Sequence, residues 1–355
     1  MELQDLAIDG YERVLRVSDA DAGLTGVIAI HSTRFGPAVG GLRMRPYQTE
    51  QAALDDVLRL ARGMTYKNAA ADLPLGGGKA VIIGDPARDK TPARLTAFGQ
   101  AIEALEGRYW TAEDMGMTPA DLEIVARSTG YVAGLASGEY ASGDPSPVTA
   151  RGVFEAARTT LAHATGSDDL VGKRIALQGL GNVGRALAGM FAEAGATLLV
   201  TDMDQARVDE AVAALGATAI APDAIIAAGA DLFAPCAIGG ILDAASIPTL
   251  KVRAICGSAN NQLATPEDGS RLMARGILYA PDYVVNAGGI INAATEVLRI
   301  RDRAPFTETR LAAITEFLDR AFTRARAEGV GPEVIADRLV EEKLAAPPAD
   351  AIAAK

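Results

Sequence analysis

The chain has 355 residues, a hydrophobic fraction of 49% and a formal net charge of −11. This length is typical of about two domains, each able to bury its own core. The negative charge argues against nucleic acid or an anionic membrane surface as partner, because both require a basic face. The few cysteines and histidines predict no disulfide framework and no metal site. With no basic-then-apolar leader and no bilayer-length apolar run, we expect a cytoplasmic protein.

The N-terminal part of the chain mixes strands and helices. We expect strands at 26–31, 80–83 and 109–112 and helices at 49–64 and 92–105. Thr49 has the residue type of an N-cap, and apolar residues recur at helical spacing after it. Lys67 then falls near the end of that helix, and Lys79 follows a glycine turn into a strand. The strand at 109–112 delivers Asp114 to a loop, a common place for catalytic side chains.

Lys67 and Lys79 flank a segment that ends in three consecutive glycines, Gly76–Gly78. A buried lysine near a second cation loses its proton more easily, because desolvation and like charge both disfavour the ammonium form. One lysine could then act as an acid or base while the other holds an anion, and the glycines would let a ligand approach closely. The alternative is a glycine turn between two solvated lysines. Asp114 has an alternative too, as the N-cap of a following helix.

A run of turn formers at 142–147 predicts a connection between domains. Beyond it, strands and helices alternate, which is the pattern of a doubly wound parallel sheet. The expected strands are 174–178, 197–201, 231–234, 252–256 and 277–279, and the expected helices are 149–164, 182–194 and 206–215. From 287 onward the chain is expected to be helical, with an amphipathic stretch at 309–327.

Gly179, Gly181 and Gly184 form a GxGxxG pattern directly between an expected strand and an expected helix. In this context the pattern predicts a dinucleotide site, in which the helix N-terminus receives the phosphates. Asp202 ends the next strand, where a carboxylate accepts hydrogen bonds from the ribose and repels a 2′-phosphate, so NAD is favoured over NADP. Arg207 keeps NADP open, and the alternative for Asp202 is a plain helix cap.

Several longer motifs resemble those of the glutamate/leucine/phenylalanine/valine dehydrogenase family, in matching order and spacing. They are the segments 36–44, 64–70, 73–86, 111–116, 179–184, 257–262 and 279–289. Within that family the chain is most similar to leucine dehydrogenases. The resemblance implies a two-domain α/β fold. An α/β substrate-binding and oligomerisation domain would span 1–145, helices at about 322–355 would pack back on it, and a Rossmann-type NAD-binding domain would span 146–321.

The resemblance also implies the reaction: NAD-dependent, reversible oxidative deamination of leucine, valine or isoleucine to a 2-oxo acid and ammonia. The alternative is the same chemistry on phenylalanine or another bulky apolar L-amino acid. A hydroxy-acid dehydrogenase is disfavoured, since His31 and His163 lie outside every motif. A catalytically silent NAD-binding protein would not need Lys67, Lys79 and Asp114. The family's habit implies a homo-oligomer, either a dimer or an octamer.

Individual roles follow from the resemblance. Lys67, with Asn261, would bind the substrate carboxylate. Lys79 would polarise the carbonyl and activate water, while Asp114 would shuttle protons. Residues expected around the substrate side chain are Val39, Gly40, Met64, Ala112, Ile290 and Ala293, and residues expected at the cofactor are Gly179, Gly181, Asn182, Val183, Gly184, Asp202, Ala259, Asn260 and Asn286. Ala293 is smaller than the valine expected there, which leaves room for larger substrates.

Overall fold

The computed structural model describes residues 1–347, which form two compact units. The first unit contains residues 1–144 and 290–306, and the second contains 145–289 and the chain from 307 onward. The expected domain division differs in the C-terminal region. There the segment that joins the first unit is 290–306, whereas the helices expected to pack back on it belong to the second. Residues 348–355 of the expected range 322–355 lie outside the described residues.

The first unit is built on a seven-stranded mixed sheet with the order β1-β2-β3-β6-β4-β7, in which β5 also pairs with β6. Its strands are β1 (Glu2–Leu6), β2 (Arg13–Asp19), β3 (Leu24–Ser32), β4 (Ala38–Val39), β5 (Leu42–Arg45), β6 (Gly76–Ile83) and β7 (Tyr109–Trp110), and its helices are α1 (Glu50–Ala70), α2 (Pro92–Glu103) and α3 (Pro119–Val125). β1, β2, β3 and β6 pair antiparallel, whereas β4 and β5 run parallel to β6.

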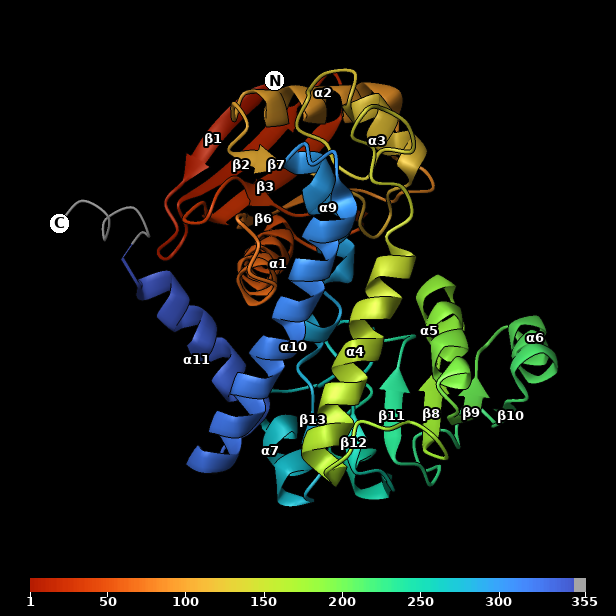
Figure 1. The fold of residues 1–355 in the computed structure, drawn as a ribbon. Helices are drawn as coiled ribbons and strands as arrows, with labels where there is room; N and C mark the ends of the chain where they lie inside the picture. The colour runs from red at the N-terminus through yellow and green to blue at the C-terminus, as the bar shows by residue number, and fades with distance from the viewer. Residues whose placement is uncertain (348–355) are drawn as a thin grey trace. The chain divides into compact units, whose positions relative to one another are not determined.

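Side chains of the sheet alternate between two cores, because successive residues of a strand point to opposite faces. Val81 packs with Val57 and other residues of α1 on one face. Ile82 packs with Phe98 of α2 on the other, together with α3, and Figure 1 shows these helices on opposite sides of the sheet. Lys79 pairs in register with Ala29, which lies in the α1 core. Lys79 therefore belongs to the α1 face.

Helix α1 begins as expected and ends later. Thr49 is its N-cap and accepts a hydrogen bond from the Ala52 amide at 3.1 Å. The helix continues past Met64 to Ala70, because the weak helix formers Thr65, Tyr66 and Asn68 are buried there and tertiary packing overrides their propensity. The chain then turns at Asp72, which has φ of 53°. Lys67 consequently lies in the last helical turn.

The second unit contains a parallel six-stranded sheet with the order β10-β9-β8-β11-β12-β13. Its strands are β8 (Arg174–Gln178), β9 (Thr197–Thr201), β10 (Thr218–Ala219), β11 (Leu232–Pro235), β12 (Ala254–Ile255) and β13 (Leu278–Tyr279). Strand order reverses between β8 and β11, and ligands of such sheets bind outside the carboxyl ends of the strands at this point. The doubly wound sheet expected from the sequence is confirmed.

Helices of the second unit are α4 (Ser146–Thr165), α5 (Asn182–Glu193), α6 (Gln205–Leu215), α7 (Glu267–Ala274), α8 (Asp282–Val285) and α11 (Pro332–Ala345), with the 3₁₀ turn η1 (Ile247–Thr249). α9 (Gly288–Val297) and α10 (Arg303–Glu328) cross the unit boundaries. The end of α10 is fastened to α4, because His163 Nε2 lies 2.6 Å from Asp319 Oδ1 and its ring contacts Phe322. Tyr283 donates to Asp337 on α11 at 3.0 Å. These contacts hold α10 and α11 in the second unit.

Candidate active site

The three glycines expected to form a turn are instead the first residues of strand β6. A Cβ on Gly77 would lie 2.0 Å from the amide nitrogen of Thr65 in α1, and one on Gly76 would lie 2.0 Å from the Ser32 carbonyl oxygen. Asn68 of α1 donates to the Gly76 carbonyl at 2.5 Å. Gly77 therefore lets α1 lie directly against β6, and Gly76 lets β3 lie close to the same strand, so the close approach is between parts of the protein.

Lys79 is a buried residue, only 7% exposed. Its ammonium forms an ion pair with Oδ2 of Asp114, whose other oxygen accepts the Met115 amide at 2.7 Å. The Leu42 amide donates to the Ala112 carbonyl at 2.8 Å, which brings the loop after β7 alongside β5 and β6. A solvated Lys79 is thereby ruled out.

Asp114 does not cap the following helix. α3 is capped by Thr118, which shares a capping box with Asp121. Gly41 allows the close position of Asp114, since a Cβ on this glycine would lie 2.8 Å from the Asp114 Cβ. The carboxylate is thus directed toward Lys79 and is available for chemistry.

Burial and charge set the protonation of this pair in opposite ways. Burial lowers the pKa of the Lys79 amine below its ordinary value, and the Asp114 carboxylate only partly opposes the shift. Burial by itself would raise the pKa of Asp114, but the Lys79 ammonium and the Arg43 guanidinium hold it below its usual value. An amine that releases its proton readily beside a carboxylate that stays ionised is suited to general acid–base catalysis.

Arg43 is a neighbour of this pair that sequence reasoning missed. Its Nε lies 3.3 Å from Asp114 Oδ2, and its Nη1 lies 3.0 Å from Asp56 Oδ2 on α1. The residue lies inside the motif at 36–44, two positions after a pair of glycines, and within β5. That position was a usable signal, but its partner Asp56 carried none.

The residues expected around the substrate side chain all belong to the first unit. Val39 is fully buried in β4 and Ala112 lies on the segment paired beside it. A Cβ on Gly40 would lie 1.8 Å from the Gly78 carbonyl oxygen and 3.1 Å from Met64 Cγ, so these residues are immediate neighbours. Ile290 and Ala293 lie three residues apart on α9, which places them on one face of that helix.

Lys67 is partly buried in the last turn of α1, one residue before the Asn68 that contacts β6. Asn261, its expected partner toward the substrate, lies in the second unit with φ of 52°. Asparagine is among the few residues that adopt this left-handed conformation readily.

The glycine fingerprint lies at the carboxyl end of β8 with the geometry that a dinucleotide requires. Gly179 has φ of 97°, and a Cβ on Gly184 would lie 1.9 Å from the Gly179 carbonyl oxygen. Gly181, the N-cap of α5, differs, because a Cβ there would meet no protein atom within 4 Å. The protein itself does not require glycine at 181, which indicates space for a ligand above the amides of Asn182 and Val183.

Asp202 lies at the carboxyl end of β9, the next strand. Its oxygens accept hydrogen bonds from the backbone amides of Leu180 at 2.6 Å and Asp204 at 2.8 Å. Burial would raise the pKa of this carboxyl, but these hydrogen bonds outweigh burial and lower it. Asp204, and not Asp202, is the N-cap of α6. Arg207 Nη1 lies 4.0 Å from Asp202 Oδ2.

The segment 257–262 is held in place by a buried glutamine. The side-chain Nε2 of Gln262 donates to the carbonyls of Gly257 and Ala259, and the backbone amide of Gln262 donates to Asp282 Oδ2. Asn286 donates to Asn260 Oδ1 at 2.7 Å. Among the residues that the structure describes, the buried Oδ1 of Asn286 has no hydrogen-bond partner. A ligand amide would satisfy it, so these residues and the fingerprint fit a nicotinamide dinucleotide.

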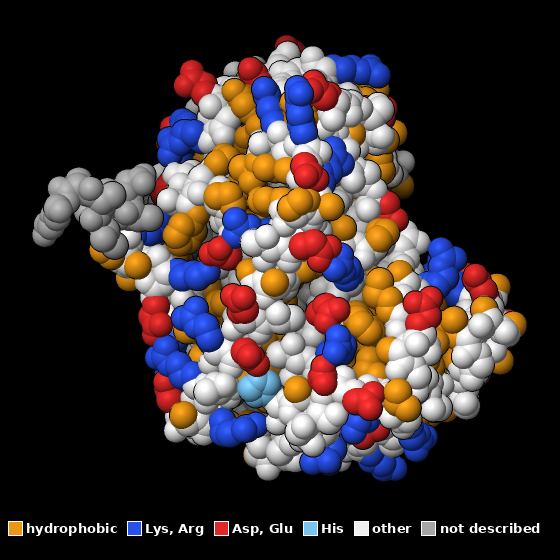
Figure 2. Space-filling view, in the orientation of Figure 1, with side chains coloured by type: hydrophobic (Ala, Val, Ile, Leu, Met, Phe, Trp, Pro, Cys, Tyr) orange, Lys and Arg blue, Asp and Glu red, His pale blue; other side chains and the backbone are white. Residues whose placement is uncertain are grey.

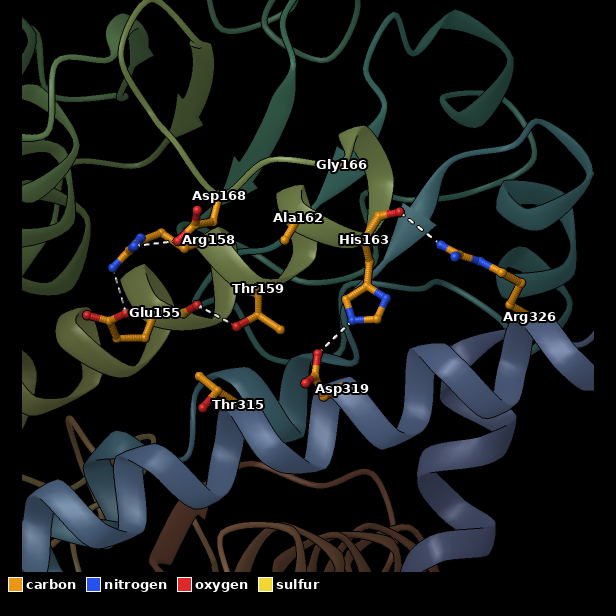
Figure 3. A pocket seen from close by; sticks show the side chains of 10 residues that line it. All are labelled: Glu155, Arg158, Thr159, Ala162, His163, Gly166, Asp168, Thr315, Asp319 and Arg326. Carbon is orange, nitrogen blue, oxygen red and sulfur yellow. Dashed lines mark hydrogen bonds and ion pairs between the residues drawn. The ribbon is translucent and has the colours of Figure 1, made fainter.

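A hollow in the second unit has chemistry different from that of the Lys79–Asp114 pair. It is an open depression of about 520 Å³ between α4 and α10, and Figure 3 shows its charged side chains facing one another. Arg158 pairs with Asp168, and His163 pairs with Asp319. Acidic and basic side chains are also interspersed on the face drawn in Figure 2. Because these charges satisfy each other, the hollow is not the candidate active site.

Neither a metal cluster nor a membrane span is found in the described part of the chain. Within residues 1–347, no three side chains of His, Cys, Asp or Glu are grouped to hold a metal ion. Over the same residues, no helix combines the length and the apolar character needed to cross a membrane.

The chain thus has the two parts of a dinucleotide-dependent dehydrogenase: a fingerprint sheet and a unit with a buried acid–base pair. The family model of the Glu/Leu/Phe/Val dehydrogenase dimerisation domain matches residues 11–131, and that of the Glutamate/Leucine/Phenylalanine/Valine dehydrogenase domain matches residues 199–328. The chain belongs to this family. It is an amino acid dehydrogenase, and its cofactor is NAD.

Individual relatives agree with this assignment. Leucine dehydrogenase of Geobacillus stearothermophilus is 48% identical over 335 residues, which are 94% of this chain and 90% of the relative. Phenylalanine dehydrogenase of Caldalkalibacillus thermarum is 44% identical, over 95% of this chain and 92% of the relative. The crystal structure of L-tryptophan dehydrogenase from Nostoc punctiforme has a TM-score of 0.84 at 40% identity, and the match covers 94% of this chain and 95% of that one. The expected resemblance to leucine dehydrogenases is confirmed.

Proposed function

We propose that the protein catalyses the reversible oxidative deamination of branched-chain L-amino acids, leucine together with valine and isoleucine. The products are the 2-oxo acid, ammonia and NADH. The observation that carries this proposal is the buried ion pair between Lys79 and Asp114, together with the small and apolar residues Gly40 and Met64, which lie next to each other where Gly40 meets Gly78, the residue before Lys79. A second carboxylate, as in glutamate, would be desolvated beside these residues without a partner.

In the proposed reaction Lys67 binds the substrate carboxylate, with Asn261 as its amide partner. Asp114 takes a proton from the substrate amine, which frees the nitrogen lone pair. NAD supplies the acceptor for the hydride that leaves the α-carbon. Lys79, as the neutral amine, then takes a proton from the water that attacks the imine carbon, and as the ammonium it stabilises the developing carbonyl oxygen. Ammonia leaves when Asp114 returns its proton to the nitrogen, and the Asp114 carboxylate then takes the remaining proton of the hydroxyl as the carbonyl forms.

Cofactor placement is part of the same proposal. Gly179, Gly181 and Gly184 would accept the pyrophosphate, with the amides of Asn182 and Val183 as donors. Asp202 would bind the adenosine ribose. Ala259, Asn260 and Asn286 would contact the nicotinamide end, where the buried Asn286 Oδ1 offers an acceptor.

A second substrate class is the bulky apolar amino acids. Ala293 is a small residue on α9, and the relatives of similar identity include a phenylalanine dehydrogenase. An NADH-formation assay with leucine, valine, isoleucine, phenylalanine, tryptophan and glutamate separates the possibilities. We expect the highest kcat/KM with leucine, with incomplete selectivity among aliphatic substrates, because one methylene is worth only about 1–3 kcal/mol. A higher kcat/KM with phenylalanine would establish the alternative.

We also propose a cytoplasmic homo-oligomer that assembles through the first unit. The match of residues 11–131 to a dimerisation domain supports this, and among the described residues β1 is an edge strand, which pairs with β2 alone. Light scattering after gel filtration would measure the assembly, and a monomeric mass at micromolar concentration would contradict it.

A further inference from the structure

Arg43 bridges two carboxylates that come from different parts of the first unit. The guanidinium contacts Asp114, in the loop after β7, through Nε at 3.3 Å, and it contacts Asp56, on α1, through Nη1 at 3.0 Å. Its side chain is only 13% exposed. A planar guanidinium with two fixed partners has its orientation determined on both sides.

Asp56 is itself held, so it can serve as an anchor. Tyr47 donates its hydroxyl to Asp56 Oδ2 at 2.8 Å, and Arg59 lies 2.9 Å from Oδ1. Burial raises the pKa of the Tyr47 phenol, which therefore remains a neutral donor. The chain of contacts from Tyr47 through Asp56 to Arg43 ends at the carboxylate that pairs with Lys79.

Arg43 and Lys79 contact the same oxygen atom, Oδ2 of Asp114. The guanidinium keeps its charge, because its pKa is raised by Asp114 and Asp56 despite burial. This fixed cation lowers the pKa of Lys79, whereas Asp114 and, more weakly, Asp56 raise it. Burial raises the pKa values of Glu113 and Tyr109, and the negative charge of Asp114 adds to both shifts. When Lys79 is neutral, Arg43 remains as the counter-ion of Asp114.

We propose that Arg43, anchored by Asp56, is a positioning residue that holds the Asp114 carboxylate against Lys79 during the proton transfers of the reaction. This role rests on the proposed function. It assigns to Arg43 two effects that a purely structural arginine would not have. One is the orientation of Asp114, and the other is the pH at which Lys79 becomes an amine.

The test compares Arg43→Met, Arg43→Lys and Asp56→Asn with the wild type in leucine deamination, measured as kcat from pH 6 to 11. Arg16→Met is the matched control, since Arg16 also bridges a strand to α1, through Glu50 at 2.9 and 3.0 Å, away from Asp114. The ionisation of leucine is common to all variants, so differences between profiles report the enzyme. Thermal unfolding and NADH affinity establish that each variant is folded.

For Arg43→Met we expect kcat to fall by roughly 100-fold, as for a reacting group that is misplaced. The ascending limb of the plot of kcat against pH should move to higher pH by about one unit, since loss of a neighbouring cation makes Lys79 harder to deprotonate. Arg43→Lys should leave the ascending limb at the wild-type pH but keep only part of kcat, because lysine retains the positive charge and lacks the planar guanidinium that contacts both carboxylates. Asp56→Asn should move the limb to lower pH, and it keeps the proposal testable if Arg43→Met does not fold. Arg16→Met should match the wild type in both readouts.

Outcomes that overturn the role are distinct from those that overturn the proposed function. If the wild type deaminates leucine and the folded Arg43 variants keep the wild-type pH profile, the positioning role is wrong. An equal loss in Arg16→Met with unshifted limbs would show general destabilisation, which also contradicts the role. If the wild type forms no NADH with any amino acid, the proposed function fails first, and the role falls with it.

Discussion

Replacement of Asp202 by asparagine should narrow the preference of this enzyme for NAD over NADP. The carboxylate ends β9 and accepts the amides of Leu180 and Asp204. Asparagine has the same shape and keeps one acceptor oxygen, so the glycine loop loses less support than it would with alanine. The negative charge at the expected ribose position is removed, and Arg207, 4.0 Å away, no longer has that charge as a partner.

The magnitude follows from the charges involved. A 2′-phosphate carries about −1.5 to −2 charges near neutral pH. At roughly 6 Å and an effective dielectric constant of about 20, its repulsion by one carboxylate is about 3 kcal/mol per unit charge before screening. Salt and the open surface reduce this to about 1–2 kcal/mol. We therefore expect the NAD to NADP ratio of kcat/KM to fall by about 5- to 30-fold.

The assay is NADH or NADPH formation from leucine at fixed ionic strength, with Asp204→Asn as the control. Asp204 also pairs with Arg207, at 3.2 Å, but it is half exposed and caps α6. The control should therefore change the ratio by less than about two-fold, within the range expected for exposed pairs. The KM for NAD should rise in Asp202→Asn, because one amide of the loop loses its acceptor. An unchanged ratio in Asp202→Asn, or an equal change in Asp204→Asn, would refute the assignment.

Four further predictions follow from the first unit. Lys79→Ala should reduce the rate of deamination by at least about 1,000-fold while NADH affinity, measured by fluorescence titration, stays within about two-fold, and wild-type turnover would contradict this role. Lys67→Ala should act mainly by raising the KM for leucine, and an unchanged KM would contradict carboxylate binding by Lys67. Ala293→Val should shift kcat/KM toward valine and leucine and away from phenylalanine by about 1 kcal/mol per displaced methylene, and an unaltered ranking would remove Ala293 from the pocket. Gly77→Ala should destabilise the fold by several kcal/mol, because its Cβ would lie 2.0 Å from the Thr65 nitrogen; an unchanged urea midpoint would show that α1 can move away.

The sequence by itself determined the features that depend on local signals. Thr49 caps α1 because a hydroxyl can accept an amide three residues ahead. The fingerprint was predictable because Gly179 and Gly184 are required by backbone geometry within a few residues. The parallel sheet followed from strands and helices that alternate along the chain, and the resemblance carried the family.

Only the tertiary structure decided which side chains meet. Lys79 and Asp114 pair because parallel register sets the loop after β7 beside β5 and β6. Arg43 meets Asp56 across the packing of α1 on the sheet. The glycines 76–78, interpreted as a ligand-binding turn, are strand residues against which α1 lies. These outcomes depend on the packing of segments distant in sequence, and local propensity and periodicity carry no information about such packing.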